Sequence, residues 1–210
     1  MLVYEHQSDG VQRLVEHPEP APEPGGITVR IVASGICGTD LKIARGEHRM
    51  FPPGTTRVPG HEAVGVVQEN ASGRPEFAPG TPVAIAPNIS CGQCRACAAG
   101  RANLCANYEA VGLTFDGEFA EVLAIPASGV ANGNVMVIPT GLDLLTASLM
   151  EPVAAVVRGL RPLGLAATDS VLICGAGPIG LIALLVAKHA GVREVLVSQT
   201  SPARRQLASD

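Results

Sequence analysis

The sequence has few aromatic residues and few charges. Of its 210 residues only four are Phe and two are Tyr, and none is Trp, so the core has to be built from aliphatic side chains. Hydrophobic residues make up 47% and charged residues 16%, a balance that excludes an intrinsically disordered chain. The formal net charge is −4, with Lys and Arg scattered, so we expect neither a nucleic-acid partner nor a membrane surface as partner.

Targeting and membrane signals are also lacking. Residues 1–10 do not have the basic start and apolar stretch of a secretory signal, so we expect a cytoplasmic protein. Residues 170–187 carry no charge and approach the length of a membrane span, but three glycines and a proline among them favour a strand, a turn and a helix. Six cysteines in a cytoplasmic chain point to metal binding or catalysis before disulfides.

The first 140 residues have the pattern of a β-rich, loop-rich unit. A stiff connector rich in proline covers residues 18–26. Short apolar runs bounded by Gly and Pro then predict strands at residues 27–34, 63–68, 82–86, 119–125 and 135–138. We find no internal repeat.

The pattern changes after residue 140. Residues 143–160 have a helical composition, and Pro152 forces either a break or a new first turn there. The predicted elements that follow are a buried strand at 170–174, a helix at 178–190 ending at Gly191, a strand at 192–198 and a helix at 201–210 with Ser201 as N-cap and Pro202 in the first position. This order predicts the start of a parallel α/β sheet. Two strands do not make such a sheet, so we expect the chain to be the N-terminal part of a longer polypeptide.

Four of the six cysteines lie together with the spacing of a metal site. Cys91, Cys94, Cys97 and Cys105 follow the pattern C-x2-C-x2-C-x7-C. Four thiolates can close a tetrahedron around zinc, and Gly92 lets the backbone fold around the ion. A site closed by four protein ligands has no open position, so we expect a structural zinc. Disulfides or free thiols are the alternative.

A second set of residues suits a metal site with an open position. Cys37, in GICGTD, and His61 with Glu62, in GHE, offer three ligands and leave a fourth position for water or substrate. Glu151 is a further carboxylate in an otherwise apolar helical segment, where a charge is expensive unless it is paired or bound to a metal. The alternative for Glu151 is an exposed acid at a helix N-terminus, where the helix dipole favours it.

The third motif is rich in glycine. Gly175, Gly177, Pro178, Ile179 and Gly180 belong to a G-x-G-x-x-G segment that follows an apolar strand and opens a helix. The first glycine makes the tight turn, the second lets the backbone approach a pyrophosphate at the helix N-terminus, and the third allows the helix to pack closely on the strand. An ordinary glycine-rich turn is the alternative.

In this order, the GICGTD, GHE, four-Cys, EP and GAGPIG segments resemble the zinc-containing medium-chain dehydrogenase/reductase family, in particular its polyol and threonine dehydrogenase-like members. The resemblance implies a GroES-like, β-rich catalytic domain of α+β type over residues 1–150. It implies a linking helix and the first βαβα of an α/β Rossmann domain, incomplete here, over residues 151–210. It also implies that the longer polypeptide is a homodimer or homotetramer.

The resemblance further implies an activity and residue roles. The residues matching Cys37 and His61 hold a catalytic zinc together with an acid, either Glu62 or Glu151. The hydroxyl matching Thr39 relays the substrate proton. The reaction implied is hydride transfer from a secondary alcohol or polyol to NAD(P), with one catalytic and one structural zinc per subunit. The identity of the alcohol cannot be predicted from the sequence.

Two positions depart from the pattern of the family. Lys42 occupies the place where many relatives have His in the proton relay, so the relay ends at the ribose, at water or at Lys42, unless this lysine is only a solvated surface residue. Gln199 stands where NAD-preferring members have Asp or Glu. Arg204 and Arg205, one helical turn on, suit a 2′-phosphate, so we expect NADP rather than NAD, unless both arginines face solvent. The carboxylate matching Asp40 is implied to orient His61.

Two other functions fit these residues less well. A non-catalytic module stabilised by zinc has no need for Cys37, Thr39, His61, Glu62 and Glu151 together, yet all five are present. A zinc-free enzyme resembling quinone reductases would lack both sets of metal ligands. Because the family's full chains are longer, we expect residues 1–210 alone neither to fold stably nor to turn over substrate.

Overall fold

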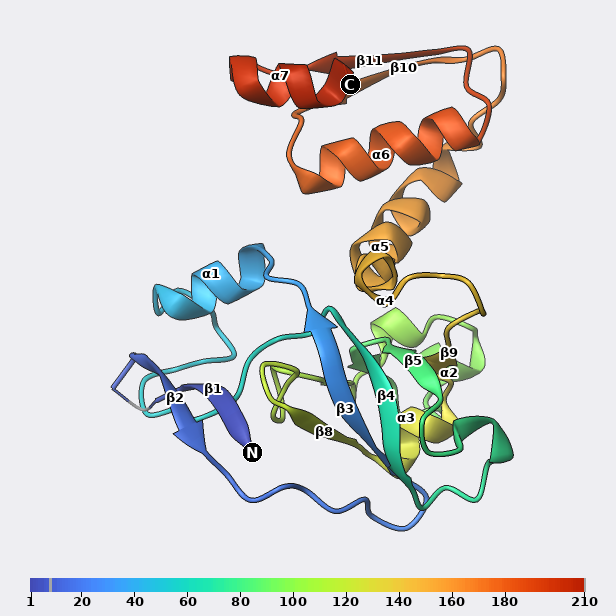
Figure 1. Cartoon of the computed structure of the whole chain (residues 1–210). Coiled ribbons are helices and arrows are strands. Elements are labelled where there is room, and N and C mark those ends of the chain that lie inside the picture. The colour runs from blue at the N-terminus through green and yellow to red at the C-terminus, as the bar shows by residue number, and fades with distance from the viewer. Residues whose placement is uncertain (8, 210) are drawn as a thin grey trace. The chain divides into compact units, whose positions relative to one another are not determined.

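The computed structural model describes residues 1–7 and 9–209, which form two compact units (Figure 1). The units are Met1–Leu149 and Met150–Asp210. The first is built around an antiparallel sheet, and the second alternates helices with parallel strands. The second unit carries the glycine-rich motif, while the cysteine motifs and GHE belong to the first.

The main sheet of the first unit has five antiparallel strands in the order β8-β3-β4-β5-β9. Their bounds are β3 (Ile27–Ser34), β4 (Ala63–Asn70), β5 (Pro82–Ile85), β8 (Val122–Ile125) and β9 (Val135–Val137). All five predicted strands are therefore confirmed, and only their ends differ. Strand β3 lies inside the sheet, where Arg30 pairs with Val66 of β4 on one side and with Val122 of β8 on the other.

Aliphatic side chains form the core under this sheet, as the scarcity of aromatic residues requires. Ile27, Val29 and Val83 are 0% exposed, and Ile125 is 1% exposed. One phenylalanine, Phe77, belongs to the same buried cluster. Each such aliphatic side chain contributes about 1.5–3 kcal/mol when it is fully buried, so the sheet is a firm support for the loops at its ends.

Smaller elements complete the first unit. They are β1 (Leu2–His6) and β2 (Gln12–Glu16), which form a hairpin, β6 (Asn88–Ile89) paired with β7 (Glu109–Ala110), and the short helices α1 (Gly38–Ala44), α2 (Arg95–Ala98), α3 (Ala127–Ala131) and α4 (Leu144–Ala147), with 3-10 turns at Pro75–Phe77 and Ala102–Leu104. The β1–β2 hairpin was not predicted from the sequence. Strands β6 and β7 bracket the four-cysteine segment.

The second unit contains α5 (Met150–Leu160), a 3-10 turn at Arg161–Leu163, β10 (Ser170–Cys174), α6 (Pro178–His189), β11 (Glu194–Ser198) and α7 (Pro202–Ser209). Strands β10 and β11 are parallel, with Val171 beside Val195. Pro152 lies in the first turn of α5, so the alternative of a new first turn is confirmed. Gly191 follows α6 with φ +78°, as predicted for a residue that ends a helix. The last predicted helical residue, Asp210, lies outside the described residues.

The prediction that residues 170–174 are a buried strand is wrong for this structure. Exposure alternates along β10, and Leu172 and its neighbour Leu196 on β11 are 62% and 52% exposed. Helix α6 packs on one face of the two strands, where Val171 and Ile173 are partly buried. An apolar run is fully buried only when both faces of its sheet are covered.

The uncharged residues 170–187 form β10, the glycine-rich turn and most of α6. Across residues 1–7 and 9–209, no helix has the length and hydropathy needed to cross a membrane. The prediction of a strand, a turn and a helix in this segment is therefore confirmed.

Gly60, directly before His61, provides a test of the packing in the first unit. Its φ is +97°, and an added Cβ would lie 2.6 Å from Phe119 Cδ1 and 2.9 Å from Phe119 N. We expect Gly60→Ala to lower the free energy of unfolding by about 1–2 kcal/mol from the backbone conformation and by about 1–3 kcal/mol more from the collision. Urea unfolding followed by circular dichroism measures the loss.

Gly54→Ala is the matched control for this prediction. Gly54 has a similar φ of +91°, but no heavy atom lies within 4 Å of the added Cβ. Gly54→Ala should therefore show only the backbone part of the loss. Equal destabilisation by the two substitutions would contradict the close packing of Gly60 on Phe119.

Candidate functional site

Cys37 is held in place by the start of helix α1. As the N-cap residue, it accepts a hydrogen bond at its Sγ from the Thr39 backbone N–H, at 3.2 Å. In return, Asp40 Oδ2 accepts from the Cys37 backbone N–H at 2.8 Å. These reciprocal bonds form a capping box, which fixes the position of the sulfur at the end of the loop after β3.

The pairing of two strands brings His61 and Glu62 to this sulfur. Ser34, the last residue of β3, pairs with Ala63, the first residue of β4. His61 and Glu62 precede Ala63 directly, and His61 Nε2 lies 3.1 Å from Cys37 Sγ. One ligand atom from each of Cys37, His61 and Glu62 lies within 4.8 Å of the other two. The structure thus brings the three predicted ligands together.

The two ring nitrogens of His61 face different groups. Nε2 faces the sulfur of Cys37, whereas Nδ1 lies 3.9 Å from Asp40 Oδ1. Both side chains are largely buried, with 12% of His61 and 6% of Asp40 exposed. A carboxylate on the far side of the ring is the usual partner of a metal-binding histidine, because it fixes the orientation of the ring.

The donor set of this cluster fits zinc. With Zn–S near 2.3 Å and Zn–N near 2.0–2.1 Å, tetrahedral coordination separates the sulfur and the nitrogen by about 3.6 Å. The observed 3.1 Å is shorter, so the two side chains need to move apart by only a few tenths of an ångström. A thiolate, an imidazole and a carboxylate leave one tetrahedral position open.

Two further predicted residues lie on the starts of helices. Thr39 is partly buried in the first turn of α1, next to Cys37. Glu151 is partly buried in the first turn of α5, in the second unit. The relay role of Thr39 and the ligand role of Glu151 stay predictions.

The four cysteines of the second motif converge. The sulfurs of Cys91 and Cys105 are 3.4 Å apart, and those of Cys94 and Cys97 are 3.5 Å apart. Two further sulfur pairs are separated by 3.9 and 4.0 Å. A disulfide needs about 2.05 Å, whereas four sulfurs around zinc lie about 3.8 Å from one another. The disulfide alternative is therefore wrong, and the arrangement fits a tetrathiolate zinc site.

Backbone N–H groups favour negative charge on some of these sulfurs, although the pKa of Cys105 is raised to about 11 because the Cys91 backbone N–H, which lowers it, is outweighed by burial and the neighbouring thiols. The pKa of Cys94 is lowered to about 6, first by the backbone N–H of Cys97 and then by the Cys97 side chain. The backbone N–H of Cys91 donates to Cys105 Sγ at 3.3 Å. Gly92, with φ +72°, makes the turn that brings the two ends of the segment together. Thiolates are the form in which cysteine binds metal.

The glycine-rich turn has the geometry expected of it. Gly175 has φ +108° and its N–H donates to Ser198 O at 2.8 Å, which ties the turn to the end of β11. Gly177 is the N-cap of α6, Pro178 is its first residue, and the space where a Gly177 Cβ would lie is open. A Cβ on Gly180 would collide with the carbonyl oxygen of Gly175. The turn therefore fits the pyrophosphate of a dinucleotide.

Residues 23–135 match the family described as the alcohol dehydrogenase GroES-like domain. The match covers more than half of the chain and includes both cysteine motifs and GHE. The chain belongs to the zinc-containing medium-chain dehydrogenase/reductase family. Its GroES-like fold, expected from the sequence motifs, is thereby confirmed.

Among related proteins, L-threonine 3-dehydrogenase of Streptomyces avermitilis is 38% identical over 210 residues, which cover 99% of this chain and 59% of that protein. L-galactonate-5-dehydrogenase of Escherichia coli is 36% identical over 187 residues, covering 89% of this chain and 52% of that protein. The chain thus spans a little over half the length of these relatives.

Two solved structures carry the same fold with different nucleotides. A short chain alcohol dehydrogenase of Escherichia coli complexed with NADH superposes with a TM-score of 0.90 at 30% identity, covering 100% of this chain and 59% of that one. A zinc-binding dehydrogenase of Sinorhizobium meliloti bound to NADP superposes with a TM-score of 0.86 at 37% identity, covering 99% and 58%. Solved structures of this fold therefore include one with NADH and one with NADP.

The turn after β11 holds the residues predicted to select the cofactor. Gln199 Oε1 accepts a hydrogen bond from the Ser201 N–H at 3.1 Å. Arg205 Nη1 donates to the carbonyl oxygens of Gln199 and Thr200 at 2.9 and 2.8 Å. Arg205 is therefore bound to the turn itself, and the exposed Arg204 is the remaining candidate for a 2′-phosphate.

Sequence reasoning missed His48, which lies in the loop after α1. Its pKa is lowered by burial first and then by the charges of Arg49, Lys42 and His61. His48 Nδ1 accepts a hydrogen bond from the Met50 N–H at 3.3 Å. One signal in the sequence could have revealed it. Lys42 stands where many relatives carry a histidine, and His48 supplies an imidazole a few residues farther on.

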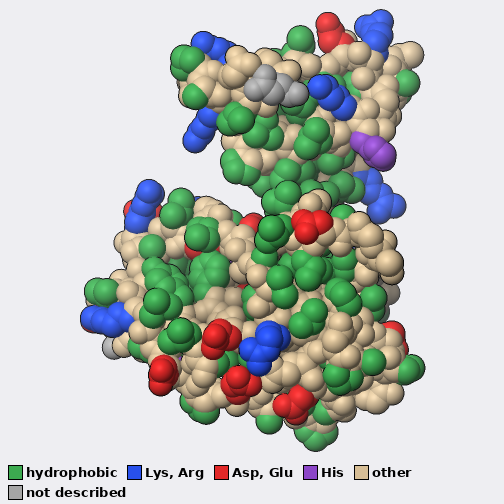
Figure 2. Space-filling model, in the orientation of Figure 1, with side chains coloured by type: hydrophobic (Ala, Val, Ile, Leu, Met, Phe, Trp, Pro, Cys, Tyr) green, Lys and Arg blue, Asp and Glu red, His purple; other side chains and the backbone are tan. Residues whose placement is uncertain are grey.

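Another missed feature is an apolar hollow beside α1. A cavity of about 460 Å³ is lined mostly by apolar side chains, among them Ile36 and Phe119, together with the polar residues Gln12, Ser34 and Asp40. Figure 2 shows hydrophobic side chains gathered around a hollow in this region of the first unit. The hollow borders the carboxylate that faces His61, so the metal-binding cluster has an apolar surface next to it.

The contact between Asp40 and His61 yields a prediction. Asp40→Asn keeps an oxygen for the Cys37 N–H but removes the negative charge that faces His61 Nδ1. We expect zinc affinity at this site to fall by about 10–100-fold. Competition with a chromophoric chelator measures the change in the full-length gene product.

Asp9→Asn is the control, since Asp9 is an exposed acid whose ion pair is with Arg13, at 2.7 Å. It should leave zinc affinity unchanged. If Asp40→Asn and Asp9→Asn bind zinc equally well, then Asp40 does not orient His61.

Proposed function

We propose that the protein is a zinc-dependent oxidoreductase that transfers a hydride from a secondary alcohol or polyol to NAD(P). The observation that carries this proposal is the placement of Cys37 Sγ 3.1 Å from His61 Nε2, with Glu62 in reach. The glycine-rich turn in the same chain adds the second requirement, a nucleotide-binding helix N-terminus.

Some residues of the site would bind the catalytic zinc, and others would orient a ligand or transfer the substrate proton. Cys37 and His61, with Glu62 or Glu151, would hold the catalytic zinc, and this ion would supply the Lewis acidity that lowers the pKa of an alcohol. Asp40 orients His61. The hydroxyl of Thr39 would accept the proton of the substrate alcohol and pass it outward, and a bound nicotinamide would supply the acceptor for the hydride and its electron pair.

The cofactor site is assigned to the second unit. Gly175, Gly177 and Gly180, with Pro178 and Ile179, form the turn that binds the pyrophosphate of NAD(P). Gln199 stands where NAD-preferring members have a carboxylate, which would repel a 2′-phosphate. Because Gln199 is uncharged and Arg204 supplies a positive charge nearby, we propose a modest preference for NADP.

A second zinc is assigned to the four-cysteine segment, where it would serve the fold and not the reaction. The sulfur separations of 3.4–4.0 Å support this assignment. We further propose a cytoplasmic location, a small-molecule alcohol or polyol as substrate, and a homodimer or homotetramer as the assembled form. These last statements are carried by the family resemblance.

Metal content tests the two assignments together. We expect two zinc ions per subunit in the full-length gene product, because both donor sets are complete. Cys105→Ser should reduce the zinc content to one ion per subunit, and the fraction of this variant that folds should keep part of the dehydrogenase activity. Cys37→Ser should also leave one zinc ion per subunit but should abolish the activity. Elemental analysis and a dehydrogenase assay supply both measurements.

Cys174→Ser is the control for these variants, since Cys174 is exposed and belongs to neither cluster. It should keep both zinc ions and full activity. A wild-type content of one zinc per subunit, combined with no dehydrogenase activity, would favour the alternative of a non-catalytic module stabilised by zinc.

The cofactor preference has its own test. We expect the wild-type kcat/KM to be higher with NADP, and Gln199→Asp to shift the ratio toward NAD by about tenfold or more, because a carboxylate repels the 2′-phosphate and accepts from ribose hydroxyls. Arg204→Gln should shift it in the same direction. A strong wild-type preference for NAD would overturn the NADP assignment without touching the proposed reaction.

A further inference from the structure

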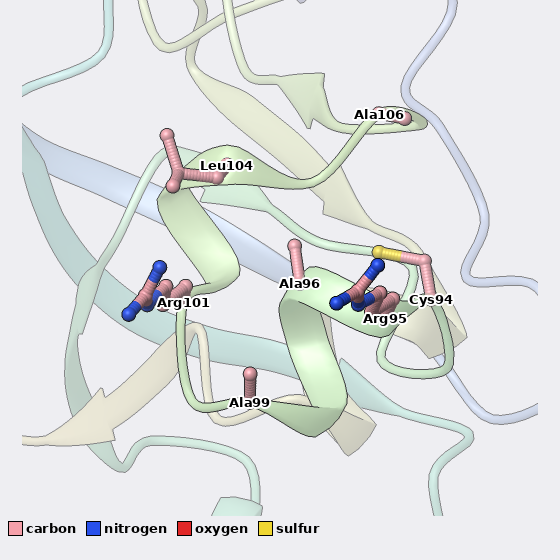
Figure 3. Close-up of a pocket in the computed structure, with 7 residues that line it drawn as sticks. All are labelled: Cys94, Arg95, Ala96, Ala99, Arg101, Leu104 and Ala106. Atoms are coloured by element: carbon pink, nitrogen blue, oxygen red, sulfur yellow. The ribbon is translucent and has the colours of Figure 1, made fainter.

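A cavity of about 430 Å³ opens beside the four cysteines (Figure 3). Cys94 lines it together with Arg95, Arg101, Leu104 and three alanines. Figure 3 shows Arg95 next to Cys94 and Arg101 on the other side of Ala96. Neither the proposed reaction nor the proposed cofactor site uses these two arginines.

Both arginines belong to the short segment that carries the four sulfurs, and they line one cavity with Cys94. Arg95 follows Cys94 directly and begins α2, and its carbonyl accepts from the Ala99 N–H at 3.1 Å. The chain then turns back, so that the Arg101 N–H donates to Ala96 O at 2.8 Å. The Arg101 carbonyl in turn accepts from the Leu104 N–H at 2.8 Å, one residue before Cys105.

The charges of this segment are few. Between residues 87 and 108 the only charged side chains are Arg95 and Arg101. In the part of the chain that the structure describes, the ion pairs formed by arginines are those of Arg13, Arg30 and Arg74, so no carboxylate pairs with the two arginines of the cavity. Four thiolates and one Zn²⁺ would together carry a charge of −2, and the two guanidinium groups carry +2.

We propose that Arg95 and Arg101 are the counter-charges of the four-cysteine zinc site and slow the loss of zinc from it. This inference rests on the structural zinc proposed above. The site with zinc carries −2, whereas a site that has lost zinc and taken up four protons is neutral, so cations nearby stabilise the site with zinc and their removal favours the loss of zinc. The two arginines act on this site through their charge and are not ligands of the ion.

The experiment measures zinc release from the full-length gene product. The Arg95→Gln, Arg101→Gln double variant is mixed with excess chromophoric chelator at ionic strengths of about 0.01 M and about 1 M, where the Debye lengths are about 30 Å and about 3 Å. The release phase that Cys105→Ser removes identifies the four-cysteine site. We expect this phase to be about tenfold faster in the double variant at low salt, and close to wild type at high salt, where charges are screened.

Two further variants separate charge from structure. The Arg95→Lys, Arg101→Lys pair keeps both charges and should release zinc at nearly the wild-type rate at either salt concentration. The Arg158→Gln, Arg161→Gln pair removes two exposed arginines from the second unit and should have no effect on this phase. Circular dichroism confirms that all variants are folded.

Three outcomes would overturn the proposal. They are an unchanged release rate in the glutamine double variant, an acceleration of equal size at high salt, and a lysine pair that behaves like the glutamine pair. A wild-type protein without the phase that depends on Cys105 would instead refute the structural zinc itself, and the reaction proposed at Cys37 and His61 would still stand.

Discussion

The contact between Cys37 Sγ and His61 Nε2 is the interaction on which the functional account depends. It follows from one strand pair, because Ser34 at the end of β3 faces Ala63 at the start of β4. In an antiparallel pair these ends lie at the same edge of the sheet, so the loops that follow and precede them meet. A slip of one residue in this register would turn the side chains to the other face and separate the two ligands.

The two metal-binding clusters differ in what supports them. The cluster at Cys37 stands on a sheet with a continuous aliphatic core, whose packing does not need an ion. The four-cysteine segment has only the two-residue strands β6 and β7 at its base and few apolar residues of its own. A segment of this size cannot build a core, and metal coordination supplies the missing stabilisation.

Much of the fold was predictable because local signals agreed. Strand β3 has the predicted bounds, since alternation, the proline-rich connector before it and the glycine after it all indicate the same segment. The exposure of Leu172 was not predictable, because an apolar run shows that a strand can be buried but not whether both faces are covered. The metal ligands were identified by motif, but only the strand register gives their separation. His48 was missed because its loop has no periodic pattern, and the burial that lowers its pKa depends on the tertiary fold.

The most direct test of the account is an anomalous difference map at the zinc absorption edge, from crystals of the full-length gene product. A catalytic zinc held by Cys37 and His61 predicts a peak about 2.3 Å from Cys37 Sγ and about 2.0–2.1 Å from His61 Nε2, with a carboxylate oxygen as a further ligand. A map with density at the four cysteines alone, and with Cys37 and His61 too far apart to share an ion, would contradict it.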